Sequence, residues 1–138
     1  MQVEQMDTWA ASIPAKPGGL ASKLDALSKA NVNLEFVISR RTPEKAGEGV
    51  VFVTPVKGDA GVRAAKDAGF DKSETMHTLR IESDAKPGEG ARIAHALGEQ
   101  GVNLRGFSAA ALGRKFVAFV ALDSADDEKK AMGILQRL

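Results

Sequence analysis

The chain has 138 residues, of which 43% are hydrophobic and 27% charged, and its formal net charge is +1. This composition is that of an ordinary globular protein, which excludes a fibrous or disordered chain, and the near-neutral charge gives no reason to expect a polyanionic partner. The absence of cysteine excludes disulfides and thiolate metal sites.

The first half of the chain is predicted to alternate strands and helices. Trp9, Ala11 and Ile13 alternate with Ala10 and Ser12, which is typical of a short strand that ends before the turn at residues 17–19. A leucine row on one helix face follows, and the helix ends at residues 31–33. We then expect strands at 36–38 and 50–56 separated by a solvated hairpin loop at 40–49, a helix at 59–68 and a weak strand at 71–76.

The second half is predicted to repeat this order. We expect strands at 79–82, 105–109 and 116–122, and helices over 88–100 and from residue 125 onward. The last helix carries apolar residues at 131, 134, 135 and 138, and its three acidic residues at 126–128 lie in the first turn, where the helix dipole favours them. No strand follows this helix, so the second half lacks the fourth strand of the first.

The two halves are copies of one unit. The segment 15–34 agrees with the segment 85–104 at ten of twenty positions, beginning with Ala-Lys-Pro-Gly and ending with Val-Asn-Leu in both copies. A long period that occurs only twice indicates a duplicated small domain. We therefore predict an α+β fold of two tandem ferredoxin-like βαββαβ units, residues 1–76 and 77–138, each with an antiparallel sheet and helices on one face.

This layout resembles that of ACT domains, from about Trp9 to Leu138. The best-matching motifs are Ala15-Lys16-Pro17-Gly18-Gly19-Leu20 and Asp84-Ala85-Lys86-Pro87-Gly88-Glu89-Gly90, each followed by a Val-Asn-Leu at the start of the second strand. The resemblance implies a regulatory protein that binds a small molecule, usually an amino acid, around these turns and acts on a further protein. Stand-alone pairs of such units without a catalytic domain also occur.

The residues of the two turns suit such a ligand. Glycine after proline leaves backbone N–H groups uncovered at a helix start, where donors lack intrahelical partners and the dipole favours a carboxylate. An α-ammonium group would need an acceptor, for which Asn33, Asn103 and Asp84 are candidates. The candidate ligand-binding residues are thus Asp84, Ala85, Lys86, Pro87, Gly88, Glu89, Gly90 and Asn103 in the second unit, and Ala15, Lys16, Pro17, Gly18, Gly19 and Asn33 in the first. The alternative interpretation is that the glycines and asparagines only form turns.

The two candidate sites are expected to be unequal. The second unit has an acid, Asp84, before its turn, and we expect Gly90 to leave room and backbone access at the helix start. The first unit has no side-chain acceptor in its turn and places Leu20 where the second has Gly90. We therefore expect the segment 84–90, together with Asn103, to supply the tighter contacts.

Other residue patterns indicate no catalysis. His77 and His95 are the only histidines and have no neighbours at metal-ligand spacing, and no serine or threonine has the setting of a nucleophile. We expect no cofactor, no metal and no enzymatic activity. One alternative is a structural subunit that has lost its ligand. A less favoured one is an RNA-binding module of the same topology, which would need exposed aromatic residues on the strands corresponding to 50–56 and 116–122.

Location and assembly can also be predicted. The first residues resemble no signal peptide and no apolar run reaches membrane-spanning length, so we expect a cytoplasmic protein without membrane contact.

The strands 50–56 and 116–122 are apolar on both faces, which predicts one continuous sheet formed by the two units and a homodimer or larger assembly that covers the open face. Residues 2–6 are predicted to form a strand that completes the second unit, within the chain or across the assembly.

Overall fold

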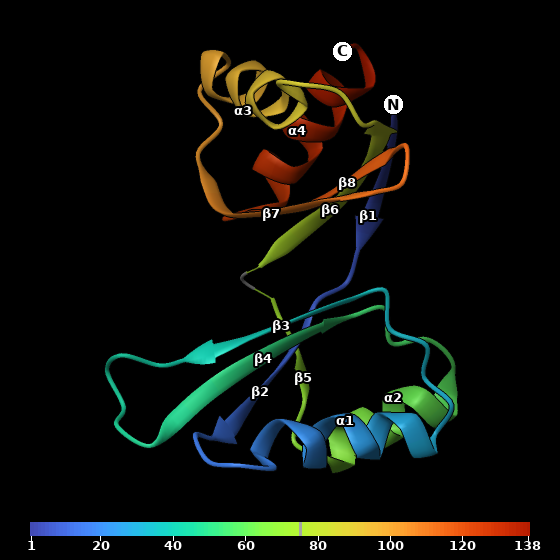
Figure 1. The fold of residues 1–138 in the computed structure, drawn as a ribbon, viewed down its shortest axis with the longest axis vertical. Coiled ribbons are helices and arrows are strands. Elements are labelled where there is room, and N and C mark those ends of the chain that lie inside the picture. The colour runs from blue at the N-terminus through green and yellow to red at the C-terminus, as the bar shows by residue number, and fades with distance from the viewer. Residues whose placement is uncertain (75) are drawn as a thin grey trace. The chain divides into compact units, whose positions relative to one another are not determined.

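Two four-stranded antiparallel sheets, each accompanied by two helices, make up the fold (Figure 1). The computed structural model describes residues 1–74 and 76–138. It divides into a first-repeat unit, Asp7–Ser73, and a second-repeat unit, Met1–Met6 with Glu74–Leu138. The expected units were residues 1–76 and 77–138, whereas here the boundary lies between residues 73 and 74 and residues 1–6 group with the second repeat. The predicted α+β class with two ferredoxin-like units is confirmed.

The first-repeat unit has the strand order β3-β4-β2-β5. Its elements are β2 (Trp9–Pro14), α1 (Gly19–Lys29), β3 (Phe36–Arg41), β4 (Glu48–Thr54), α2 (Asp59–Asp67) and β5 (Asp71–Lys72). Two elements differ from expectation. Strand β3 continues into the predicted hairpin loop, so Arg40 and Arg41 pair with Val50 and Gly49. Strand β5 is only two residues long, and the expected strand 71–76 includes Thr75, which lies outside the described residues.

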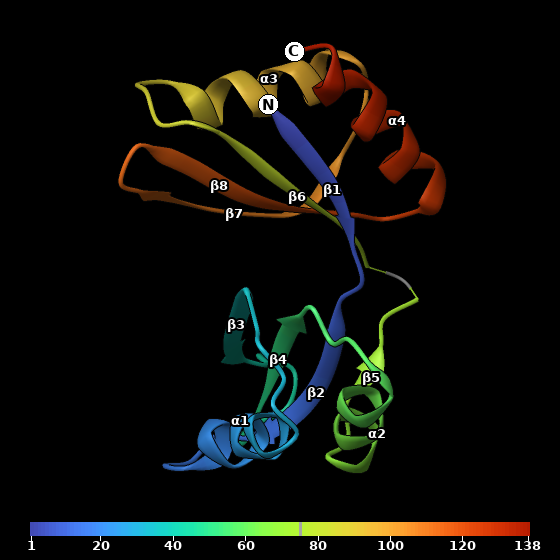
Figure 2. The same cartoon turned by 90° about the vertical axis from the view of Figure 1, so that its right-hand side faces the viewer.

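The second-repeat unit has the equivalent strand order β1-β6-β8-β7. Its elements are β1 (Gln2–Met6), β6 (His77–Asp84), α3 (Glu89–Glu99), β7 (Leu104–Leu112), β8 (Lys115–Leu122) and α4 (Ala125–Gln136). Helices α3 and α4 lie on one face of this sheet (Figure 2). The fourth-strand position, which β5 fills in the first repeat, is filled here by β1.

The predicted strand at residues 2–6 is therefore confirmed, and it lies within the chain. Val3 lies opposite Ile81 in an antiparallel pairing with β6 and packs against the core of the second repeat. The Gln5 amide donates a hydrogen bond to the carboxylate of Glu128, which is buried on α4. Backbone pairing, an apolar contact and this hydrogen bond thus attach β1 to the unit from which it is most distant in sequence.

The expectation of one continuous sheet is wrong. Among the described residues, the strands form two separate four-stranded sheets. In each repeat, the short edge strand pairs with a strand of its own unit and not with the other sheet. Strand β5 pairs with β2, and β1 pairs with β6. Each repeat is thereby completed by a short strand on the same edge.

Each unit has its own core between sheet and helices. In the first, Trp9 is 5% exposed and packs with Leu27, Val53 and Phe70. In the second, the buried residues from the sheet and both helices are Leu79, Ile81, Ile93, Leu97, Val102, Ala118, Val120, Leu122, Ala131, Ile134 and Leu135. The two cores are small, as expected for units of this length.

Candidate functional site

The Lys-Pro-Gly turns of the two repeats have the same backbone conformation. Gly18 and Gly88 each precede a helix with φ of 83°, and their ψ values are −6° and 5°. This left-handed conformation favours glycine. Neither helix start receives a side-chain capping hydrogen bond. The N–H groups of Gly19 and Glu89 donate instead to the backbone carbonyls of Lys16 and Lys86, at 3.1 and 3.2 Å. The next N–H groups of each first turn are the candidate donors for a ligand.

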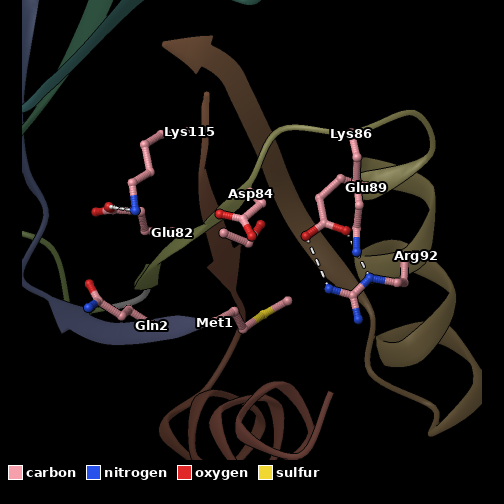
Figure 3. Close-up of a pocket in the computed structure, with 9 residues that line it drawn as sticks. Met1, Gln2, Glu82, Asp84, Lys86, Glu89, Arg92 and Lys115 are labelled. Carbon is pink, nitrogen blue, oxygen red and sulfur yellow. Dashed lines mark hydrogen bonds and ion pairs between the residues drawn. The ribbon is translucent and has the colours of Figure 1, made fainter. Parts of the chain in front are cut away.

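A cavity of about 300 Å³ lies at the turn of the second repeat (Figure 3). We call it the second-repeat cavity; its lining residues are Met1, Gln2, Glu82, Ser83, Asp84, Lys86, Glu89, Arg92 and Lys115. These come from β1, β6, the turn, α3 and β8. The lining contains three acidic and three basic side chains, so the cavity is polar and close to neutral.

Glu89 and Arg92 form one wall of this cavity. Glu89 is 2% exposed, and Arg92 donates two hydrogen bonds to its carboxylate, from Nε at 2.8 Å and from the second guanidinium nitrogen at 3.1 Å. This pairing holds the pKa of Glu89 at about 2, against the opposing effect of burial. Glu89 is thus ionised at neutral pH and neutralised by Arg92.

Glu82 is the second acid of the lining that is paired with cations. Arg80 lies 3.1 Å and Lys115 3.4 Å from its carboxylate oxygens. The hydrogen bond from Arg80 lowers the pKa of Glu82 most, and burial opposes it. Within residues 1–74 and 76–138, by contrast, neither Asp84 nor Lys86 makes an ion pair. Lys86 makes the smallest contribution to the lowered pKa of Glu89. One anionic side chain and one cationic side chain of the lining, neither of them in an ion pair, therefore face a possible ligand.

The structure brings together some of the predicted residues of the second repeat and separates others. Asp84, Lys86 and Glu89 line the second-repeat cavity, and Ala85, Pro87, Gly88 and Gly90 form the adjoining turn and helix start. Asn103 does not line this cavity. It follows the other end of α3, an 11-residue helix whose length is about 16 Å, and therefore cannot share a small ligand with Asp84.

The room expected beside Gly90 is bounded by aromatic rings. A Cβ atom at this position would lie 3.7 Å from Phe116 and 3.9 Å from Phe107. In the first repeat, Leu20 occupies the position of Gly90 and packs against the core. The position of Phe116, which lies opposite Ser83 in the second repeat, is taken in the first repeat by Gly49, which lies opposite Ile13. Gly90 therefore accommodates an aromatic side chain from β8, which was not the predicted role.

The first repeat has a cavity of about 350 Å³ at its own turn. We call it the first-repeat cavity; its lining residues are Ile13, Pro14, Ala15, Lys16, Pro17, Leu20, Ser39, Arg40, Arg41 and Gly49. Of the predicted residues, Ala15, Lys16 and Pro17 line it, and Gly18 and Gly19 adjoin it. Asn33 lies instead in a separate cavity of about 280 Å³ that contains Asn31 and Glu35.

Sequence reasoning missed Arg92, Glu82 and Lys115. The spacing of Glu89 and Arg92, three residues apart on a helix, was the signal that could have revealed their pair. No comparable signal existed for Lys115, which lies at a hairpin where charge normally serves solubility and which reaches Glu82 only because β8 pairs with β6. Met1 and Gln2 enter the cavity through the pairing of β1.

Residues 1–74 and 76–138 contain no cluster of three or more histidine or acidic side chains arranged to hold an ion. None of their helices is long and apolar enough to cross a membrane.

The Glu89 pair is expected to make stability depend on acid pH. The pKa of Glu89 is about 2 in the folded protein, below the ordinary 4.5, so its stabilising contribution is complete above about pH 4.5 and is lost as the pH falls toward 2. Urea unfolding between pH 5 and pH 2.5 should show a smaller loss of stability for Glu89→Gln than for the wild type. Glu99→Gln, which removes an exposed acid from the same helix, should behave like the wild type. Equal pH slopes for wild type and Glu89→Gln would contradict this assignment.

No protein-family model and no curated protein matches the chain. Solved structures do. A protein from Bacteroides thetaiotaomicron, BT0572, aligns with a TM-score of 0.80 and 20% identity over 98% of this chain and 89% of its own. The regulatory subunit of aspartate kinase from Thermus thermophilus aligns with a TM-score of 0.66 and 15% identity over 99% and 94% of the two chains. At these identities the similarity establishes the fold alone.

Proposed function

We propose that this protein is a non-catalytic regulatory protein of the ACT type that binds an amino acid in the second-repeat cavity. The observation that carries the proposal is the pair of available opposite charges, Asp84 and Lys86, at one cavity. The other acids of the lining, Glu82 and Glu89, are already paired with cations. A zwitterion carries one charge complementary to Asp84 and one complementary to Lys86.

The proposed roles follow from charge and position. The α-ammonium group of the ligand binds the Asp84 carboxylate. The α-carboxylate binds Lys86 and the N–H groups that follow Glu89 in the first turn of α3, where no side chain caps the helix and the helix dipole favours an anion. Glu89 and Arg92 hold each other in place and form a rigid wall. The cavity lies at the lower end of the size range of small-molecule sites, as suits a ligand of this size.

The similarity of fold supports the regulatory part of the proposal. The solved structures that align over nearly the whole chain include the regulatory subunits of aspartate kinase from two Thermus species. We propose that this protein likewise acts through a partner protein, in the cytoplasm, and as a homodimer or larger assembly. Light scattering at micromolar concentration should show an oligomer, and a strict monomer would contradict the assembly.

A thermal-shift screen against the twenty amino acids tests the proposal. A ligand that binds only the folded state raises the free energy of unfolding by RT ln(1 + [L]/Kd), about 2.7 kcal/mol at a hundredfold excess over Kd. We expect one amino acid, or a chemically related group, to raise the melting temperature. If none of the twenty does so at millimolar concentration, the protein is better explained as a structural subunit without a ligand.

A further inference from the structure

The first-repeat cavity differs in charge from its counterpart. Its ionisable lining residues are Lys16, Arg40 and Arg41, and no carboxylate lines it. The lining of the second-repeat cavity balances three acids with three cations. Two cavities at the same place in a duplicated fold therefore present different requirements, one for a neutral zwitterion and the other for negative charge.

Position-by-position comparison at the seventy-residue offset shows how the acids were replaced. The polar residues of the second-repeat cavity on β6 and α3 are replaced by residues without charge, so that Glu82, Ser83, Asp84, Glu89 and Arg92 correspond to Ser12, Ile13, Pro14, Gly19 and Ser22. Lys86 alone is retained, as Lys16. An ammonium group in the first-repeat cavity would therefore find no carboxylate, which argues against an amino acid as its ligand.

The arginines, in contrast, have no counterpart in the second repeat. Arg40 and Arg41 occupy the positions of Ala110 and Ala111 at the same offset. Arg41 lies opposite Gly49 on β4, and Gly49 lies opposite Ile13 on β2, so these three residues share one sheet face beside the turn. The end of β3 thus adds the cationic side chain of Arg41 on this face, whereas Arg40, the preceding residue of the strand, belongs to the opposite face.

These cations are not neutralised within the protein. Among residues 1–74 and 76–138, no ion pair involves Lys16, Arg40 or Arg41, and Glu48, which lies opposite Pro14 in the sheet, is 3.9 Å from Lys45. Like charges gathered at one cavity repel each other, and an anion removes that repulsion. The uncapped start of α1 next to Gly18 favours negative charge at the same place.

We propose that the first-repeat cavity binds a small anion with at least two negative charges, a phosphate or a dicarboxylate, and not an amino acid. Arginine presents a planar fork that matches both phosphate and carboxylate groups, and lysine adds a point charge. The protein would then carry two different ligand classes on its two repeats. This inference does not depend on amino-acid binding in the second repeat.

Isothermal calorimetry at low ionic strength tests the proposal with inorganic phosphate and malonate, and with acetate as a monoanion. The variants are Arg41→Gln and Lys16→Gln, and the matched control is Arg63→Gln, which removes an exposed cation from α2 outside the cavity. We expect phosphate or malonate to bind the wild type and acetate to bind at least tenfold more weakly. Each cavity variant should weaken binding at least tenfold, and the control should change it less than twofold.

Two results would overturn the proposal. Absence of binding by both dianions shows that no such site exists, and equal weakening by Arg63→Gln shows diffuse attraction to surface charge. A further variant, Asp84→Asn, separates this proposal from the preceding one: it should leave dianion binding unchanged whether or not the second-repeat cavity binds an amino acid. Preference for phosphate over malonate, or the reverse, identifies which of the two anion types the cavity selects.

Discussion

Removal of residues 1–6 is expected to destabilise the second-repeat unit by about 3 to 5 kcal/mol. Met6 is 6% exposed and Val3 packs against the core, and burying such side chains contributes about 1.5 to 3 kcal/mol each when burial is complete. The truncation also exposes the edge of β6 and removes the Gln5 donor from the buried Glu128 carboxylate. A loss of this size is a large part of the stability of a small domain.

Urea unfolding followed by two signals can locate this effect. Trp9 is the only tryptophan and lies in the first-repeat unit, so its fluorescence reports on that unit, whereas circular dichroism reports on both. A matched pair of point variants completes the test: Val3→Asp places a charge against the core, and Glu4→Gln changes the exposed neighbouring residue. We expect a loss of about 2 kcal/mol or more for the first and little change for the second. Full stability of the truncated protein would show that β1 is dispensable.

Gly19→Ala is expected to cost about 2 to 3 kcal/mol. A Cβ atom at Gly19 would lie 2.2 Å from the Pro14 carbonyl oxygen, so the turn after β2 or the start of α1 would have to shift. The control is Gly98→Ala in α3, where a Cβ atom meets nothing within 4 Å and alanine favours the helix by about 0.5 to 1 kcal/mol. Chemical denaturation should therefore show opposite signs for the two substitutions. Equal effects would mean that the turn tolerates a side chain.

Much of the fold could be predicted because the sequence repeats itself. The doubled Lys-Pro-Gly and Val-Asn-Leu segments and the spacing of leucines indicate two units and the order of their elements. The strand at residues 2–6 was predicted from the missing fourth strand of the second unit and is confirmed. The predicted continuous sheet is not observed among the described residues. A short strand, β5 in the first repeat and β1 in the second, occupies one edge of each sheet, so the two sheets do not pair at that edge.

The candidate site was predictable where it depends on a local turn and not where it depends on strand pairing. Asp84, Lys86 and Glu89 follow from the turn itself. Lys115 reaches the site because its strand, β8, pairs with β6. The register of that pairing cannot be read from a single sequence. Asn103 was assigned to the site because its motif recurs in both units, but the recurrence reflects the shared exit from the first helix of each repeat.

Calorimetric titration of the Asp84→Asn protein with the amino acid that most stabilises the wild type tests the central claim most directly. Asp25→Asn, which removes an exposed acid from α1, is the control. Asp84→Asn removes a hydrogen bond to a charged group, so we expect binding to weaken by about 1.5 to 3 kcal/mol, which corresponds to a Kd about 10 to 150 times higher. The control should bind as the wild type does. Unchanged affinity in Asp84→Asn, together with abolished binding in Gly18→Val, would place the amino acid in the first repeat and contradict the assignment of the second-repeat cavity.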